Sequence, residues 1–121
     1  MNGVIIAVVD DMFFASKIRA VAEAVGVEIS FPRSKEALVE KVREAKPRLI
    51  VVDLHNQKVD AVELASDLKG DEGLREVPLV GFFSHVETEL RRNALDAGFD
   101  QVLPRSVFAK ELPDILTGFT R

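Results

Sequence analysis

Three aspartates follow runs of apolar residues in the sequence. Asp10 and Asp11 come directly after "VIIAVV", residues 4–9, and Asp53 ends "LIVVD", residues 49–53. Short apolar runs rich in β-branched residues are typical of strands that are covered on both faces of a parallel sheet. In such sheets ligands bind beyond the carboxyl ends of the strands, so we expect the three carboxylates to lie together at that edge.

Three carboxylates at one edge would repel one another and raise one another's pKa values unless a cation lay among them. Oxygen ligands in this number suit Mg²⁺, which keeps several waters and favours sites that phosphate completes. The alternative is that the adjacent pair, Asp10 and Asp11, merely begins a loop or a helix, where aspartate is common. Asp53, at the end of a second buried run, favours the metal site.

The rest of the chain alternates between strand and helix patterns. Apolar residues three or four apart predict five helices, and further short apolar runs predict strands at 27–31, 79–83 and 101–103. Residues at the expected helix starts include Ser34, Asp60 and Ser84, and Glu63 and Glu87 complete capping-box patterns for the latter two. The last helix is expected to start near Ser106, with a kink or a break at Pro113. Strict alternation predicts an α/β fold, a three-layer, doubly wound, five-stranded parallel sheet.

Composition narrows the class of protein. The 121 residues carry a net charge of −4 with acidic and basic residues intermixed, 47% of them are apolar, and none is cysteine. We therefore expect one domain over residues 1–121, in the cytoplasm, without a signal peptide or a membrane span. The absence of a basic stripe argues against direct nucleic-acid binding, and the absence of cysteine excludes disulfides and thiolate sites.

The motifs together resemble the receiver domains of two-component response regulators. "VVDD" at 8–11 is similar to the acidic pair of that family, and "LIVVDL" at 49–54 is similar to its phosphoacceptor strand. "DLHNQKVDAVEL" at 53–64 has the length of the family's next loop and helix, "VPLVGFF" at 77–83 resembles its fourth strand, and "AGFDQVLPRS" at 97–106 resembles the segment that carries its basic residue. The resemblance implies a flavodoxin-like sheet with strand order 2-1-3-4-5.

The resemblance also implies a function. Asp53 would accept a phosphoryl group from a histidine kinase or a phosphotransfer protein. Asp11, Asp53 and the backbone carbonyl of His55 would hold Mg²⁺, with Asp10 acting through bound water, and Arg105 would stand in place of the family's lysine. The domain would relay the signal by binding a downstream protein or an output domain. It would have no enzymatic activity beyond its own phosphorylation and dephosphorylation.

The sequence departs from the family at the positions of the usual switch. Phe83 stands where receivers have Thr or Ser, and Val102 stands where they often have an inward-turning aromatic residue. Ser84 would supply the missing hydroxyl if the strand end carried a bulge, or it would simply cap the next helix. Arg105 would pair bidentately with a carboxylate or phosphate, or it would be a surface arginine ahead of a helix capped by Ser106.

Other assignments are left open by the sequence. His55 and His85 would either tune water access to the site, and admit a transition metal, or be solvated loop residues. An alternative function is an interaction module with weak or no phosphorylation and an atypical switch. A cobalamin-binding domain is disfavoured, because "DLH" at 53–55 resembles the start of that motif but Lys58 replaces its glycine. Residues that would face a docking partner are Arg91, Arg92, Val102 and Phe108.

Overall fold

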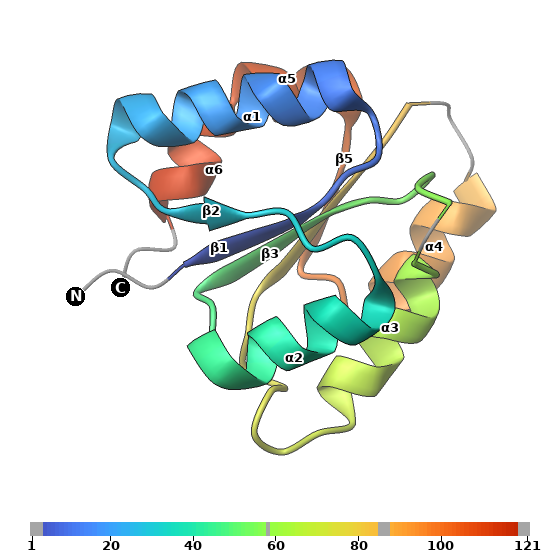
Figure 1. The fold of residues 1–121 in the computed structure, drawn as a ribbon. Coiled ribbons are helices and arrows are strands. Elements are labelled where there is room, and N and C mark those ends of the chain that lie inside the picture. The colour runs from blue at the N-terminus through green and yellow to red at the C-terminus, as the bar shows by residue number, and fades with distance from the viewer. Residues whose placement is uncertain (1–3, 58, 85–87, 119–121) are drawn as a thin grey trace.

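The computed structural model describes residues 4–57, 59–84 and 88–118. One sheet of five parallel strands runs in the order β2-β1-β3-β4-β5, which confirms the predicted fold and strand order (Figure 1). Its strands are β1 (Ile5–Val8), β2 (Ile29–Ser30), β3 (Leu49–Asp53), β4 (Leu79–Phe83) and β5 (Gln101–Pro104). The helices are α1 (Met12–Val25), α2 (Lys35–Ala45), α3 (Ala61–Lys69), α4 (Thr88–Ala97), α5 (Arg105–Lys110) and α6 (Leu112–Gly118).

The register of the strands sets the position of the carboxyl edge. Val8 pairs with Val52 across β1 and β3, and Asp53 pairs with Phe82 across β3 and β4. Strand order reverses between β1 and β3, so the chain leaves these neighbours toward opposite faces of the sheet, into α1 and α3 (Figure 1). Such a reversal opens a crevice at the carboxyl ends of the two strands.

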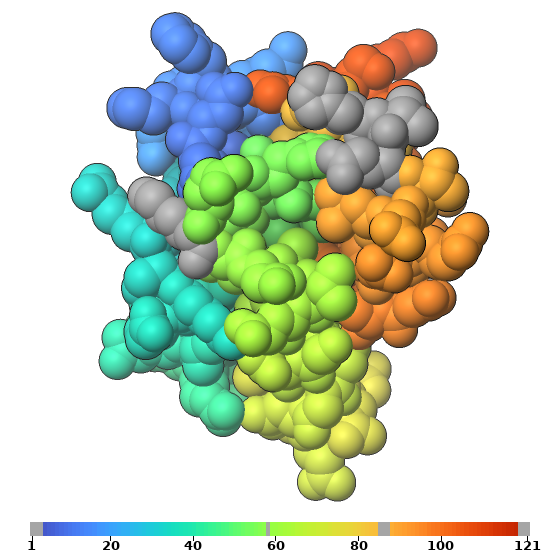
Figure 2. All heavy atoms as spheres, turned by 90° about the vertical axis from the view of Figure 1, so that its right-hand side faces the viewer, coloured from blue at the N-terminus to red at the C-terminus, as the bar shows by residue number. Residues whose placement is uncertain are grey.

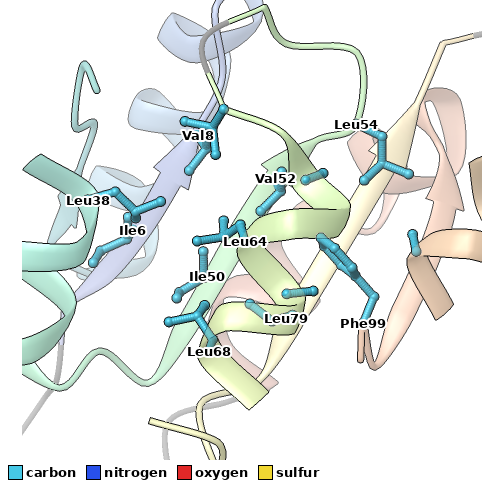
Figure 3. Close-up of a cluster of buried hydrophobic side chains, with 14 of the residues drawn as sticks. Ile6, Val8, Leu38, Ile50, Val52, Leu54, Leu64, Leu68, Leu79 and Phe99 are labelled. Atoms are coloured by element: carbon cyan, nitrogen blue, oxygen red, sulfur yellow. The ribbon is translucent and has the colours of Figure 1, made fainter. Parts of the chain in front are cut away.

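Side chains alternate between two cores along each strand because successive residues point to opposite faces. One core, drawn in Figure 3, packs Ile6, Ile50 and Val52 against Leu38 of α2 and Leu64 of α3. The other core lies under α1, α5 and α6, and its strand residues are Ile5, Ala7, Leu49, Val51, Val80 and Phe82. Every residue of β1, β3 and β4 is buried, which explains why those strands read as continuous apolar runs.

No helix in the described part of the chain combines the length and the apolar character that crossing a membrane requires.

Two of the expected helix caps are confirmed. The Ser34 hydroxyl accepts a hydrogen bond from the Ala37 amide at 3.0 Å, and the Asp60 carboxylate accepts one from the Glu63 amide at 3.0 Å. The Glu63 side chain does not complete a capping box, since it pairs with Lys35 at 2.6 Å. The expected capping box of the fourth helix includes Glu87, which lies outside the described residues.

The second strand is shorter than the predicted range 27–31. Only Ile29 and Ser30 pair with β1, because Val27 completes the end of α1. Gly26 adopts a left-handed conformation with φ of 75°, and the Val27 amide donates to the Ala22 carbonyl at 2.8 Å. This C-terminal cap removes Val27 from the strand.

The last helix agrees with the prediction at its start and at its break, but not in its cap. It begins at Arg105, next to Ser106, and the N-cap is the extended Pro104, which makes no side-chain hydrogen bond, so Ser106 does not cap it. The chain divides into α5 and α6 at Glu111. Pro113 is the second residue of α6, where a missing amide proton costs little because first-turn amides have no helical partner.

Candidate functional site

Asp10, Asp11 and Asp53 lie at the carboxyl edge of the sheet, as predicted. Asp53 is the last residue of β3, and the other two follow β1, its hydrogen-bonded neighbour. Figure 2 faces this end of the molecule, where the segment after β1 (blue), the segment after β3 (green) and the start of α4 (orange) come to one surface. The parallel register therefore brings together residues that are more than 40 positions apart in the sequence.

Asp53 is the only buried charged side chain among the described residues, with 7% of its surface exposed. Its Oδ1 accepts a hydrogen bond from the His55 amide at 2.9 Å, and no hydrogen bond from a described residue reaches its Oδ2. Burial raises the pKa of the Asp53 carboxyl, while the hydrogen bond from His55 and the positive charge of Arg105 act in the opposite direction. One oxygen of a buried carboxylate is thus oriented and the other is available.

Asp10 connects the segment after β1 to the loop after β3. Its Oδ2 accepts a hydrogen bond from the Gln57 amide at 2.7 Å, across 47 residues of sequence, and its side chain is exposed. The His55 carbonyl, expected as a metal ligand, lies in the same loop after β3, and the Gln57 side-chain amide approaches it at 3.4 Å. The loop that holds Asp53 is therefore tied to the segment that follows β1.

Asp11 is both a helix cap and an ion-pair partner. Its Oδ1 accepts hydrogen bonds from the amides of Phe13 at 2.9 Å and Phe14 at 3.1 Å, which caps α1. Its Oδ2 accepts one from Nη2 of Arg105 at 2.8 Å. The hydrogen bond from Arg105, followed by that from the Phe14 amide, lowers the pKa of the Asp11 carboxyl. One oxygen of Asp11 therefore acts as a helix cap, as the simpler interpretation of the adjacent acidic pair expects. The other oxygen is paired with the Arg105 guanidinium.

Arg105 reaches the acidic edge from the start of α5 over an aromatic surface. Its guanidinium carbon lies 4.1 Å from the centroid of the Phe14 ring, within the range of a cation–π contact. Phe14, Phe82 and Phe108 pack against one another beneath it, with centroid distances of 4.6 to 5.9 Å. Sequence reasoning placed Arg105 near the site but missed this support, although Phe14 and Phe108 are apolar residues at helical spacing in the first and last predicted helices.

The residues at the switch positions are apolar and buried. Phe83 and Val102 are 9% and 5% exposed and belong to the core on the α3 side of the sheet. Ser84 is exposed and lines a surface pocket with Phe83, Pro104, Arg105 and Ser106. Ser84 follows directly after β4 and lines the same pocket as Arg105, one residue after the position predicted for the hydroxyl.

The expectation that four residues face a docking partner is wrong for two of them. Phe108 is fully buried under α1 and Val102 is 5% exposed, because each side chain points toward one of the two cores. Arg91 and Arg92 are exposed on α4, as expected. His85 lies outside the described residues, and His55 is half-buried in the loop after β3.

The donor atoms at the edge suit a divalent cation in chemistry, since all are carboxylate or carbonyl oxygens. Within residues 4–57, 59–84 and 88–118, however, no three Asp, Glu or His side chains are already arranged to hold a metal ion. The contacts of Asp11 give a physical reason, because its two oxygens are engaged by backbone amides and by Arg105.

The raised pKa of Asp53 predicts a specific pH dependence of stability. The folded chain binds the Asp53 proton more tightly than the unfolded chain, so this group lowers stability as pH rises from 3.8 through the folded-state pKa. We expect the free energy of unfolding of Asp53→Asn, minus that of the wild type, to increase with pH across that window. Urea unfolding without divalent ions, from about pH 4 to about pH 7, measures this difference.

A matched variant should show the opposite sign. The pKa of Asp11 is lowered, so its contribution to stability is present above 3.8 and is lost as pH falls through the folded-state value. Asp11→Asn minus wild type should therefore decrease as pH rises through the region below 3.8. Equal pH profiles for the two variants would contradict the assignment of opposite environments.

The chain is similar to response regulators in sequence and to receiver domains in fold. No family model matches the chain. Response regulator protein VraR of Staphylococcus aureus is 33% identical over 87 residues, which are 72% of this chain and 40% of that protein. The chain therefore spans 40% of the length of the curated relatives that it matches.

Solved structures resemble the whole fold. The receiver domain of a sensor histidine kinase from Pseudomonas aeruginosa, with a magnesium ion coordinated in its active-site cleft, superposes with a TM-score of 0.83 over 98% of both chains at 20% identity. The Mn²⁺-bound form of response regulator Rcp1 superposes with a TM-score of 0.76, over 96% of this chain and 90% of that one, at 21% identity.

Proposed function

Because this chain is a receiver domain in its fold, we propose that it accepts a phosphoryl group on Asp53 and relays the signal by binding another protein. The observation that carries the proposal is the Asp53 carboxylate itself. It is buried at the carboxyl end of β3, Oδ1 is fixed by the His55 amide, and the charges of Arg105 and Asp10 act on the carboxyl. A carboxylate without a role is rarely buried in this way.

The proposed reaction is nucleophilic transfer. Oδ2 of Asp53 attacks phosphorus, the bond from phosphorus to the donor breaks, and the donor group leaves with the bonding electrons. The hydrogen bond from His55 and the charge of Arg105 favour the ionised form of Asp53 that attacks. Arg105 offers a planar set of donors for the phosphoryl oxygens, and Ser84, which lines the same pocket, is the hydroxyl candidate that follows β4.

A divalent cation, Mg²⁺ in the cell, is part of the proposal. Asp10, Asp11, Asp53 and the His55 carbonyl are the oxygen donors that would hold it. When bound, the cation would offset negative charge on the phosphoryl oxygens. The support is the donor chemistry at the edge, together with the metal-bound forms among the similar structures.

The phosphoryl donor would be a histidine kinase or a phosphotransfer protein. Met12 and Phe13 are 81% and 91% exposed at the start of α1, directly after the acidic pair. A donor that reaches Asp53 must approach this rim, and large exposed apolar side chains mark contact surfaces. The downstream partner would be a separate protein or an output domain, and no activity beyond self-phosphorylation and self-dephosphorylation is proposed.

The proposal is tested with a small phosphodonor. The purified chain is incubated with acetyl phosphate and MgCl₂, and its intact mass is measured. We expect the mass of one added phosphoryl group, removed by hydroxylamine because the product is an acyl phosphate. A wild-type chain that stays unmodified, while a known receiver in the same reaction is modified, would contradict the proposal.

A further inference from the structure

The cation that contacts Asp11 in the structure is a side chain of the protein itself. Nη2 of Arg105 lies 2.8 Å from Oδ2 of Asp11, and both side chains are about one-third exposed, at 34% and 37%. These residues are 94 positions apart, so only the fold brings them together. The contact lies within the set of carboxylates that the proposed function assigns to a divalent cation.

The guanidinium is held in place by more than this one contact. It lies 4.1 Å from the centroid of Phe14, and the Phe14 ring in turn packs against Phe82 and Phe108. Its backbone is fixed as the first residue of α5, directly after β5. An arginine restrained by an aromatic platform loses less conformational entropy on pairing than a free surface arginine does.

Arg105 contacts the one oxygen of Asp11 that does not cap α1. Oδ1 of Asp11 caps α1, so Oδ2 is the oxygen that could turn toward a metal, and Arg105 holds it. Asp10 and Asp53 differ from Asp11, because each has one oxygen without a hydrogen bond from a described residue. A divalent cation at this edge would therefore meet two available carboxylates and one engaged carboxylate.

We propose that Arg105 and the divalent cation compete for Oδ2 of Asp11, so that the cation releases the guanidinium from the acidic edge. The inference rests on the proposed function for the existence of the metal site and adds a competitor built into the chain. The released guanidinium remains close to Asp53, whose carboxyl already senses its charge. Metal binding would then free Arg105 for the phosphoryl group that Asp53 receives.

The test compares divalent affinity between charge-matched variants. Mn²⁺ binding by electron paramagnetic resonance and Mg²⁺ binding by calorimetry are measured for wild type, Arg105→Gln and Arg19→Gln. Arg19 is the control because it also lines a cavity with Asp10 but places its guanidinium over Phe31, 4.7 Å from the ring centroid. Both variants remove one positive charge from the same rim, and only Arg105→Gln frees Asp11.

We expect Arg105→Gln to bind the divalent cation roughly tenfold more tightly than wild type, and Arg19→Gln to differ by less than about twofold. Arg105→Lys should fall between wild type and Arg105→Gln, because an ammonium makes a point contact and cannot stack on Phe14 as a guanidinium does. Far-UV circular dichroism establishes that each variant is folded.

A spectroscopic readout follows the guanidinium directly. The Nε–Hε resonance of Arg105 is assigned in ¹⁵N-labelled wild type by its loss in Arg105→Lys, and it is followed during a Mg²⁺ titration. We expect it to shift with the same midpoint as metal binding, because its ion pair with Asp11 is broken. The resonance of Arg19 serves as the internal reference and should not follow that curve.

The outcomes separate this inference from the function on which it rests. Equal divalent affinities for wild type and Arg105→Gln, or an Arg105 resonance that ignores bound Mg²⁺, would overturn the competition and leave the metal site intact. Equal gains for Arg105→Gln and Arg19→Gln would also overturn it, since general electrostatics would explain both. Absence of divalent binding in every variant would overturn the metal site itself and the inference with it.

Discussion

Asp53→Asn is expected to abolish uptake of a phosphoryl group from acetyl phosphate. An amide oxygen is a far weaker nucleophile than a carboxylate oxygen, and the variant also removes one of the three carboxylates proposed to hold the cation. The side chain keeps its size and its Oδ1 acceptor for the His55 amide, so the loop after β3 should keep its conformation. The loss should exceed a hundredfold, the scale of removing an attacking group.

The control separates loss of the nucleophile from loss of charge or fold. Asp96→Asn makes the same chemical change at an exposed position of α4, away from the carboxyl edge, and should be phosphorylated at the wild-type rate. Asp53→Asn itself should be at least as stable as wild type at neutral pH, because it removes a buried charge whose pKa is raised. If Asp53→Asn is folded and is not phosphorylated, the loss is then due to the missing nucleophile and not to unfolding.

One result would contradict the assignment of Asp53. If Asp53→Asn took up a phosphoryl group as fast as wild type, the acceptor would be another residue. Peptide mapping would then identify it, with Asp10, Asp11 and Ser84 as the neighbouring candidates at the edge. Slow residual modification at one of these residues, well below the wild-type rate, would remain consistent with Asp53 as the acceptor.

The fold was predictable because each of its determinants is local in the sequence. Residues 49–52, followed by Asp53, and residues 79–83 show continuous apolar runs, and the structure has strands at 49–53 and 79–83. Strict alternation with helical stripes fixed the parallel class, and the rule that carboxyl ends meet at one edge placed Asp53 beside Asp10 and Asp11. The strand order came from the resemblance and is confirmed.

The contacts of Arg105 were not predictable in the same way. The sequence indicates that Arg105 follows the fifth strand, but whether its guanidinium contacts Asp11, Asp53 or solvent depends on a side-chain path across α1. The expected cap by Ser106 was wrong for a related reason, since Pro104 took the N-cap position in place of a residue with a capping side chain. Such choices depend on tertiary packing and leave little periodic signal.

The prediction that Val102 and Phe108 face a docking partner was wrong, and both residues lie in short elements whose apolar pattern does not show which face is buried. β5 has four residues, of which Val102 is buried, Leu103 is half-buried, and Gln101 and Pro104 are exposed. Phe108 packs against Phe14 and Phe82, so the apolar residue of this six-residue helix belongs to the core. The described apolar surface lies elsewhere, at Met12 and Phe13 beside the acidic pair and at Leu95.

Phe82→Ala is expected to lower the free energy of unfolding by about 3–5 kcal/mol, the largest stability effect proposed for this chain. Phe82 is fully buried and packs against Phe14 and Phe108, with ring centroids 5.0 and 4.6 Å away. Truncation would leave a cavity that rigid β4 cannot close, because Phe82 pairs with Asp53 on β3 and Leu103 on β5. The same cavity would remove support from the ring on which Arg105 rests.

Phe13→Ala provides the matched control, since it makes the same substitution beside Phe14 on α1. Phe13 is 91% exposed, and alanine favours helices, so its effect should stay within about 0.5 kcal/mol. Urea unfolding followed by circular dichroism measures both variants, because the chain has no tryptophan or tyrosine to report by fluorescence. If the two substitutions had equal effects, the three rings would not form the packed platform under Arg105, and the restraint on its guanidinium would have to come from Asp11 alone.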